Sequence, residues 1–343
     1  MLPRLTPTLL LKFFGLEPIN RLQREGKLKD NVSNTIEPLS LWEYLSTIPH
    51  KYTSDSRYID KYHNTALKIA AKLVNEGLLT PVGDKRGIHQ KYQGNGFDPR
   101  KEESGYYDFL IYGFPTILRY FKDAFRILEV EDLKTRDVSV GTAFAILHGL
   151  NRQFLVTAKH CLPPDNNIRL RIFLGFGKKY SHPNNIYVHQ DDNADIAVLE
   201  FSDKVLLSSK FFRLEKPEML DDIMGVGFPP IPGTNEALLV ASKGEITAKG
   251  NTYLHNYDLI YVNANIKGGS SGSPIINSTG SVVGFIIESA RDSNNSELQD
   301  ELRFGTGLTS DLINELVLSI VEEGNLHKEV SFEVIENGSF IIK

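Results

Sequence analysis

The chain has 343 residues, of which 41% are hydrophobic and 24% charged, the balance of a globular protein with one large domain or two. The net charge of −5 and the lack of a basic block argue against nucleic acid or an anionic membrane surface as a partner. No window of about 18 apolar residues is present, so we expect no membrane span.

The N-terminus, MLPRLTPTLLLKFFGLEP, carries an apolar run that Pro7 and Lys12 interrupt, and no small-residue cleavage site follows it. We therefore expect this stretch to be part of the fold rather than a secretory signal. Cys161 is the only cysteine, so an intrachain disulfide is excluded, which fits a reducing compartment. The sequence thus favours a cytoplasmic protein.

Residues 1–123 are predicted to form a helical N-terminal region. In NTALKIAAKLVNEGLLTP (64–81) apolar residues recur at helical spacing, and Gly77 and Pro81 mark the end of the helix. The apolar face of this helix is predicted to hold Leu67, Ala70, Ala71, Val74 and Leu78. The polar stretch GDKRGIHQKYQGNGFDPRKEES predicts an exposed loop, and Pro115 is expected to open a short helix through TILRYFKD.

Residues 124–308 are predicted to be all-β. Short apolar runs separated by turn residues are typical of a β-barrel or sandwich, and they read FRILEVE, VSVGTAFAIL, QFLVT, IRLRIFL, NIYVHQ and IAVLEF. Residues 309–343 are predicted to form a short α+β tail. In it SDLINELVLSIVEEG predicts a helix, and Asn337-Gly338 between two alternating runs predicts a β-hairpin.

Three fragments of the β region carry candidate chemistry. GGSSGSP (268–274) resembles a flexible linker when taken alone, but apolar β-rich runs flank it on both sides and make it a tight turn, in which Ser270, Ser271 and Ser273 are all candidates by residue type. His160 follows one strand in LVTAKHC, and Asp195 precedes another in NADIAVLEF. The chain order His, Asp, Ser on short strands is that of one of the unrelated folds that build this catalytic triad.

The chemistry of acyl transfer explains each of these neighbourhoods. A serine hydroxyl needs an imidazole to take its proton, and the imidazole needs a carboxylate to fix its tautomer. The negative charge on the tetrahedral intermediate needs two backbone N–H donors, for which we expect those of Gly269 and Ser271. Gly269 allows the unusual backbone angles of such a turn, and Gly272 allows close approach of substrate and backbone.

The sequence here resembles the trypsin-like serine proteases. Gly269-Ser270-Ser271-Gly272-Ser273-Pro274 is similar to their Gly-Asp-Ser-Gly-Gly-Pro signature, and closer to the Gly-Asn-Ser-Gly-Ser-Pro form of the bacterial glutamyl endopeptidase branch. TAKHC, VSVGTAFAIL, VGFPP, SKGEIT and GSVVGFII resemble further landmarks in the same order, over residues 126 to 290. The resemblance implies two six-stranded antiparallel β-barrels of the chymotrypsin type, with His160, Asp195 and Ser271 as the triad.

Departures from the family pattern concern the specificity pocket and the cysteine. Glutamyl-specific members place a histidine and a threonine where this chain has Ile286 and Ile266, and Asn265 replaces the aspartate of the trypsin type. With Ile287, these are the expected substrate-binding residues, and they favour a small or medium apolar residue before the scissile bond over Glu, Arg or Lys. Cys161 lacks a disulfide partner, so we expect a small buried apolar role for it.

No cofactor or metal is expected. The chain has no HExxH, no CxxC and no histidine cluster with ligand spacing, and Gly225-Val226-Gly227 lacks the third glycine of a dinucleotide loop. Basic residues near the helix at 64–79 (Lys61, Lys68 and Lys72) are too few to predict nucleic-acid binding.

The sequence therefore predicts an intracellular serine endopeptidase that acts on protein or peptide substrates. The alternatives are a catalytically idle fold that binds a peptide or partner, and an esterase that uses the same triad. A cytoplasmic protease must be restrained, so residues 1–123 are expected to inhibit, target or sense, with a protein partner as activator. This architecture resembles the stand-alone trypsin-like effectors that accompany bacterial defence or stress-signalling systems, an analogy at the level of the fold.

Overall fold

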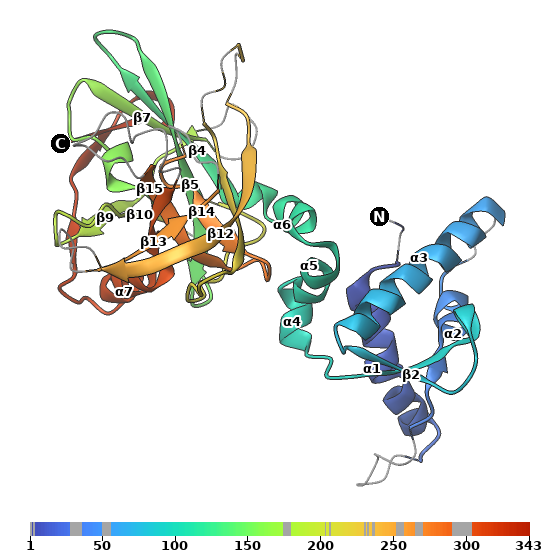
Figure 1. The fold of residues 1–343 in the computed structure, drawn as a ribbon. Helices are drawn as coiled ribbons and strands as arrows, with labels where there is room; N and C mark the ends of the chain where they lie inside the picture. Colours follow the sequence, from blue (N-terminus) through green and yellow to red (C-terminus); the bar gives the residue numbers. More distant parts are fainter. Residues whose placement is uncertain are drawn as a thin grey trace. The chain divides into compact units, whose positions relative to one another are not determined.

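The chain divides into two compact units, Met1–Thr116 and Ile117–Lys343 (Figure 1). The computed structural model describes residues 2, 4–27, 36–49, 56–173, 180–202, 204–205, 207–229, 231, 233–234, 237–251, 257–264, 270–289 and 304–343. Among the helices within these ranges, none combines the length and the apolar character that crossing a membrane requires.

The first unit combines helices with a three-stranded antiparallel sheet in the order β1-β3-β2. Its elements are α1 (Pro7–Arg24), β1 (Leu39–Ser40), α2 (Leu41–Ser46), α3 (Ser56–Asn75), β2 (Leu79–Val82), η3 (Gly87–His89), β3 (Lys91–Gly94), α4 (Pro99–Glu103) and α5 (Tyr106–Tyr112). The sheet is a correction to the sequence-based prediction of a purely helical region. The stretch predicted as a loop contains β3 and α4, and α6 (Phe114–Tyr120) spans the division between the units.

Local capping fixes where the first two helices begin. Thr6 is the N-cap of α1 and its hydroxyl accepts the Leu9 N–H at 3.2 Å, while Pro7 at the first helical position has no N–H to satisfy. In α2 the Ser40 hydroxyl accepts the Glu43 N–H, and the Glu43 carboxylate accepts the Ser40 N–H at 2.7 Å, which is a capping box. The N-terminal apolar run is thus a folded helix, as expected.

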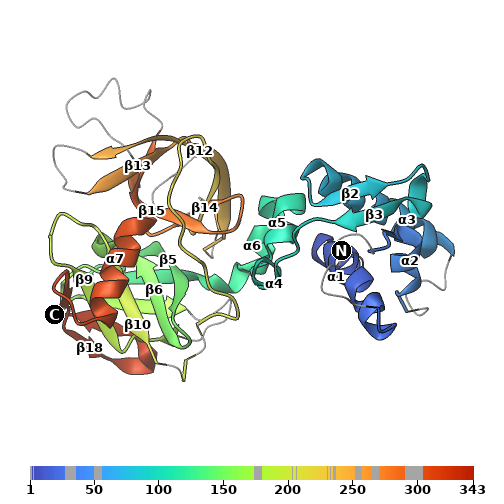
Figure 2. The ribbon, with the colours of Figure 1, turned by 90° about the horizontal axis from the view of Figure 1, so that it is seen from below.

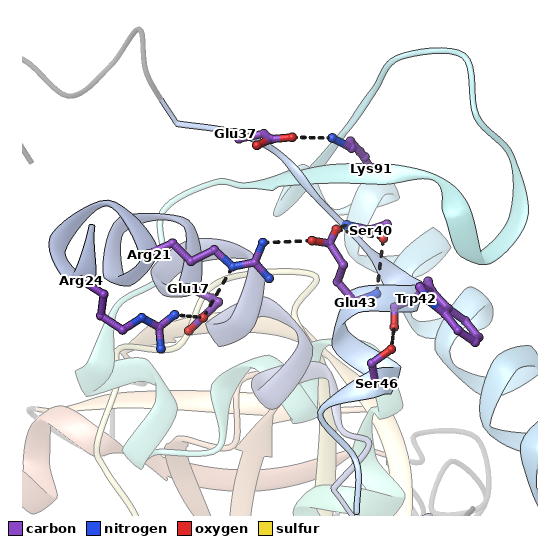
Figure 3. A network of polar contacts seen from close by, with 9 residues as sticks. All are labelled: Glu17, Arg21, Arg24, Glu37, Ser40, Trp42, Glu43, Ser46 and Lys91. Atoms are coloured by element: carbon purple, nitrogen blue, oxygen red, sulfur yellow. Dashed lines mark hydrogen bonds and ion pairs between the residues drawn. The ribbon is translucent and has the colours of Figure 1, made fainter. Parts of the chain in front are cut away.

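Polar contacts connect α1, α2 and the small sheet (Figure 3). Arg21 donates to Glu43 at 2.9 Å, so the last turn of α1 reaches the capping box of α2. Lys91 on β3 pairs with Glu37 at 2.9 Å. Trp42 points away from this network, and 48% of it is exposed.

The helix predicted at 64–79 is present as α3, and its buried face matches the predicted one at Ala70 but otherwise consists of other residues. Tyr62, Ala66, Ile69 and Leu73 are buried in the core that α3 shares with α1, whereas Leu67 and Val74 are only partly buried and Ala71 is exposed. Both stripes are apolar and recur at helical spacing, so periodicity alone does not distinguish them. Packing against Leu10, Leu11 and Phe14 of α1 selects the first stripe.

The second unit is mainly β, as the sequence predicts. Its strands are β4 (Phe125–Asp132), β5 (Val138–His148), β6 (Arg152–Thr157), β7 (Ile168–Phe173), β8 (Tyr180–Ser181), β9 (Asn185–His189), β10 (Ala197–Phe201), β11 (Asp222–Gly227), β12 (Val240–Asn251), β13 (Asp258–Val262), β14 (Pro274–Asn277), β15 (Val282–Ser289), β16 (Gly305–Thr309), β17 (His327–Glu329), β18 (Phe332–Val334) and β19 (Phe340–Ile342). Its helices are η4 (Lys122–Ala124), η5 (Lys159–Cys161), α7 (Ser310–Val321) and η6 (Glu336–Gly338).

These strands form one closed barrel and one open sheet within the described residues. The barrel has the order β11-β12-β13-β16-β15-β14, and its core holds Ile223, Ile246, Ile260, Val262, Ala264, Ile275, Val283 and Ile286. The other sheet runs β17-β9-β10-β6-β5-β4-β7-β19-β18, with β8 paired to β7. The mainly-β architecture is confirmed, with a half-barrel in place of one of the two closed six-stranded barrels.

The C-terminal tail explains why the sheet that contains β4 to β10 stays open. β17 pairs with β9 at one edge of that sheet, and β19 pairs with β7 at the other, so strands of the tail occupy both edges (Figure 2). The predicted hairpin at Asn337-Gly338 is present between β18 and β19, and Asn337 has a φ of +56°. The predicted C-terminal helix is α7, which packs against β15 and buries Leu312, Ile313 and Leu316.

Candidate active site

Strand pairing brings His160 and Asp195 to one end of the open sheet in the second unit. β6 and β10 are antiparallel neighbours in which Thr157 pairs with Ala197, so the end of β6 lies beside the start of β10. His160 follows Thr157 by three residues in the short helix η5, and Asp195 precedes Ala197 by two. The chain therefore places the imidazole and the carboxylate side by side through the register of two buried strands.

Two hydrogen bonds join these residues. The His160 N–H donates to Asp195 Oδ1 at 2.9 Å, and His160 Nδ1 lies 2.6 Å from Asp195 Oδ2. The carboxylate thus holds both the backbone and the ring of the histidine. This fixes Nδ1 as the protonated nitrogen on the Asp195 side and directs Nε2 away from it.

The environment favours the charged form of the imidazole. The hydrogen bond with Asp195, together with the adjacent thiol of Cys161, raises the pKa of His160 to about 10, against the opposite effect of partial burial. The raised pKa favours the imidazolium, a form that donates from both ring nitrogens. Such an imidazolium must lose a proton before it can act as a base.

The turn around Ser271 is held from two sides. Ser271 C=O accepts the Thr142 N–H of β5 at 3.0 Å, and the Gly272 N–H donates to Ile286 O of β15 at 2.8 Å. Gly272 has a φ of +81°, and a Cβ built there would lie 1.9 Å from Thr142 O. Only glycine fits this position, because the β5 backbone at Thr142 lies directly against it.

The Ser271 hydroxyl donates to Ile287 O at 3.3 Å. The described residues show no hydrogen bond between this hydroxyl and His160. The raised pKa of His160 favours a protonated Nε2, which offers no lone pair to a serine hydroxyl.

Thr142 holds the Ser271 turn in place, a contact that sequence reasoning missed. Its three polar groups reach three segments, since the N–H donates to Ser271 O, the carbonyl accepts Thr157 Oγ1 at 2.8 Å, and Oγ1 accepts the Phe228 N–H at 3.0 Å. The open sheet and the closed barrel are thus bonded to each other directly behind the serine. The motif VSVGTAFAIL indicated this strand but not the role of its threonine.

The loop that carries Asp195 is braced by the tail and by the barrel side of the unit. The backbone carbonyl of Asp192 accepts a hydrogen bond from the Lys159 ammonium at 2.6 Å. The Asp192 carboxylate accepts one from the ammonium of Lys328, on β17, at 2.5 Å. The Tyr257 hydroxyl donates to Asn193 O. Burial and the nearby carboxylates of Asp191 and Asp195 raise the pKa of Tyr257 to about 12, so the hydroxyl remains a donor at physiological pH.

The other predicted site residues have different outcomes. Gly269, Asn265 and Ile266 lie outside the described residues. The Ile286 side chain is 1% exposed and belongs to the core of the closed barrel, so this residue acts on the site through its backbone. Ile287 is 7% exposed and supplies the carbonyl that accepts from Ser271.

Cys161 is buried and free, as expected, and its Sγ lies 3.9 Å from Ser271 O. Its side chain is also in contact with the Gly141 position, where an added Cβ would lie 3.0 Å from Sγ. The cysteine thus packs η5 against the serine turn. Within the described ranges, no three His, Cys, Asp or Glu side chains gather as a metal site requires.

Comparison with known protein families shows which of them this part of the chain is similar to. Residues 141–285 match the trypsin-like peptidase domain. A relative described as a probable periplasmic serine endoprotease DegP-like, from Chlamydia trachomatis serovar D, is 26% identical over 242 residues. The match covers 70% of this chain and 41% of the relative, so the chain spans about two fifths of that protein's length. The domain and this relative support a serine endopeptidase.

Solved structures of proteases are similar to the peptidase domain at a low level. The active form of the Rv3671c protease from M. tuberculosis has a TM-score of 0.45 and 18% identity, and the match covers 60% of this chain and 83% of that one. The serine endoprotease from Yersinia pestis has a TM-score of 0.46 and 17% identity, with 64% and 70% covered. The HtrA-type protease AlgW with a decapeptide has a TM-score of 0.46 and 19% identity, with 64% and 70% covered.

Proposed function

We propose that the protein is a regulated serine endopeptidase in which His160, Asp195 and Ser271 act as the triad. One observation carries the proposal. The bonded pair of His160 and Asp195 and the glycine turn of Ser271 lie in a segment that matches the trypsin-like peptidase domain, and Cys161, next to the histidine, lies 3.9 Å from the carbonyl oxygen of Ser271. The residue types, their order and their placement all serve acyl transfer.

In the proposed mechanism the neutral form of His160 takes the proton from Ser271 Oγ as the oxygen attacks the scissile carbonyl. Asp195 stabilises the imidazolium that forms. The same imidazolium then protonates the leaving amine, and water repeats the sequence on the acyl-enzyme. The N–H groups of Ser271 and Gly269 are the proposed donors to the oxyanion, and the Ser271 N–H has no backbone acceptor among the described residues.

The resting arrangement supports a latent enzyme. The imidazolium of His160 and the bond from Ser271 to Ile287 O belong to one state in which the nucleophile and its base are separated. Loss of the His160 proton, or a shift of β15 that removes the Ile287 acceptor, would free the hydroxyl to bond Nε2. We infer that a protein partner or substrate makes this change, and that residues 1–116 take part in its control.

Specificity and location are further parts of the proposal. Asn265 and Ile266 provide neither the charge nor the polar partner that a charged substrate side chain requires, so cleavage after small or medium apolar residues is proposed. The resemblance to the glutamyl endopeptidase branch rests on motifs alone and does not carry its specificity here. A cytoplasmic location is proposed because Cys161 is the only cysteine and is free.

A fluorophosphonate probe tests the proposed activity. The full-length protein is incubated with the probe across a range of pH, and the adduct is located by mass spectrometry. The proposal predicts an adduct on Ser271 that is lost in His160→Ala, and cleavage of a denatured protein substrate by the same preparations. Absence of an adduct on the folded protein at every pH would contradict activity of the unassisted protein, and would leave an idle fold or an enzyme that requires its partner.

A further inference from the structure

The first unit has the element order of a helix-turn-helix domain followed by a β-hairpin. Helix α1 and strand β1 lead into α2, then α3, and then the hairpin of β2 and β3, which pairs with β1 in the order β1-β3-β2 (Figure 1). In this arrangement α3 is the second helix of the pair, the one that enters the major groove in helix-turn-helix proteins. Its inner face is buried by Tyr62, Ala66, Ile69 and Leu73, which leaves the opposite face exposed.

The exposed face of α3 carries donors at helical spacing. Lys61, Asn64 and Lys68 are all exposed, and they are three and four residues apart along one face. Seven residues of helix span about 10 Å, which is close to the roughly 12 Å width of the major groove of B-DNA. The two ammonium groups can therefore reach the phosphates that border a groove, with the amide between them at the level of the base edges.

The tip of the hairpin adds two more cations. Lys85 and Arg86 are exposed between Gly83 and Gly87, whose φ values are +79° and +63°. Among the described residues, Lys61, Lys68, Lys85 and Arg86 form no ion pair with a carboxylate, although Asp60 and Asp84 are exposed beside them. Lys72 is already engaged, because its ammonium donates to Ile111 O at 2.9 Å.

An aromatic contact holds the helix and the hairpin together as one surface. The Trp42 ring centroid lies 6.2 Å from that of His63 on α3 and 6.0 Å from that of His89 beside the hairpin. Trp42 projects from the start of α2 with 48% of its surface exposed (Figure 3). The contact fixes where the hairpin cations stand relative to α3 before any ligand binds, which lowers the ordering cost of binding.

The two units differ in net charge, and the first unit has the positive sign that favours binding to nucleic acid. Residues 1–116 contain 16 Lys and Arg against 13 Asp and Glu, whereas residues 117–343 contain 22 against 30. The sequence-based expectation against nucleic acid rested on the net charge of the whole chain, the lack of a basic block and the few lysines near α3. Lys85 and Arg86 lie in a loop, as predicted, and this loop connects β2 and β3 of the hairpin.

We propose that residues 1–116 bind double-stranded DNA, with α3 in the major groove and the β2–β3 hairpin on the adjacent backbone. Lys61, Lys68, Lys85 and Arg86 neutralise phosphates, and Asn64 faces the base edges. The unit thereby gives the peptidase a DNA-dependent location or signal. The proposal does not depend on peptidase activity, because the triad plays no part in the contact.

Fluorescence anisotropy with the full-length protein and a labelled 24-base-pair DNA duplex tests the proposal. Binding is expected at 50 mM salt, and the slope of log K against log salt concentration is expected near −3 to −4, from about −0.9 for each of four phosphate contacts. Lys61→Glu/Lys68→Glu and Lys85→Glu/Arg86→Glu are each expected to weaken binding at least tenfold.

The control variant is Arg100→Glu/Lys101→Glu on α4, which changes the net charge equally but leaves α3 and the hairpin intact; it is expected to retain binding within about twofold. Thermal unfolding of every variant establishes that it is folded. Absence of duplex binding at 50 mM salt would overturn the proposal, as would equal weakening by the α4 control or tighter binding to duplex RNA or to a single strand of the same sequence. Ser271→Ala is expected to bind the duplex like the unaltered protein, which keeps this test independent of the proposed catalysis.

Discussion

The two sides of the candidate active site differ in how far they are assembled. On the side of the open sheet, His160 and Asp195 share two hydrogen bonds, of 2.9 and 2.6 Å. On the side of the closed barrel, the Ser271 turn is equally well held through Thr142 and Ile286, but its hydroxyl donates to Ile287 O. The proposed triad therefore has its histidine and carboxylate joined, whereas the serine hydroxyl bonds a backbone carbonyl.

This difference shows how a single ionisation can control a preformed site. The hydrogen bond that orients His160 is also the first cause of its raised pKa. Asp195 therefore has two opposing effects on His160: it orients the imidazole, and it raises the pKa that the imidazole must overcome to act as a base. Experiments that remove either side of the site separate these two effects.

The largest effect is expected from Ser271→Ala. Removal of the nucleophile deletes the covalent step, so kcat for peptide hydrolysis should fall by about 10⁶, as when other triads lose their serine. The measurement is single-substrate kinetics with the purified variant. Residual hydrolysis above a few per cent of the unaltered protein would show that another group performs the attack.

Asp195→Asn tests the orienting side. The change removes both the charge and the acceptor on the Nδ1 side, so kcat should fall by about 10⁴ when each protein is compared on its own pH plateau. The pKa of His160 should also fall towards its ordinary value, because its largest raising cause is gone. A pH–rate profile checks both, and an unchanged acidic limb would contradict the assignment.

Gly272→Ala tests the nucleophile side, with Gly149→Ala as the matched control. Both glycines have positive φ, +81° and +61°, so both changes carry the same type of backbone strain. Only at Gly272 would a Cβ meet another atom, 1.9 Å from Thr142 O. Displacing the turn by about 1 Å should lower kcat/KM about 10²-fold, while Gly149→Ala should leave it nearly unchanged. Equal losses in the two variants would show that the tight turn has no special role.

The smallest effect is expected from Lys328→Ala, which removes one brace of the Asp195 loop. The Lys328 and Asp192 side chains are 45% and 79% exposed, and exposed ion pairs contribute little. We expect kcat/KM to change less than about twofold, since Lys159 and Tyr257 still hold the loop. A large loss would mean that the tail positions Asp195 directly.

The fold and the site were predictable from the sequence to different degrees. In the peptidase domain β4, β5, β6, β7, β9 and β10 lie within two residues of the predicted runs, because long alternating or apolar stretches specify buried strands. In the first unit β1 has two residues and β3 reads Lys-Tyr-Gln-Gly, which gives no strand pattern. The buried face of α3 was predicted correctly only at Ala70, because the partner helix α1 decides between two apolar stripes.

At the site, residue types and chain order predicted His160, Asp195 and Ser271, because triad chemistry restricts the candidates. Thr142 and Lys328 were missed. Their roles arise from contacts between the sheet and the barrel and from pairing of the tail with β9, which no local pattern encodes. The structure also showed Ile286 as a core residue, a burial that its position on a strand beside the turn did not reveal.

The most direct test of the central claim, that His160 rests as an imidazolium and keeps Ser271 idle, is the rate of fluorophosphonate labelling of Ser271 as a function of pH. Below the pKa of His160 only the deprotonated fraction can act, so the rate should rise about tenfold per pH unit and level off near the pKa of about 10. Labelling that already reaches its plateau by about pH 7.5, near the range of an ordinary histidine, would contradict the claim.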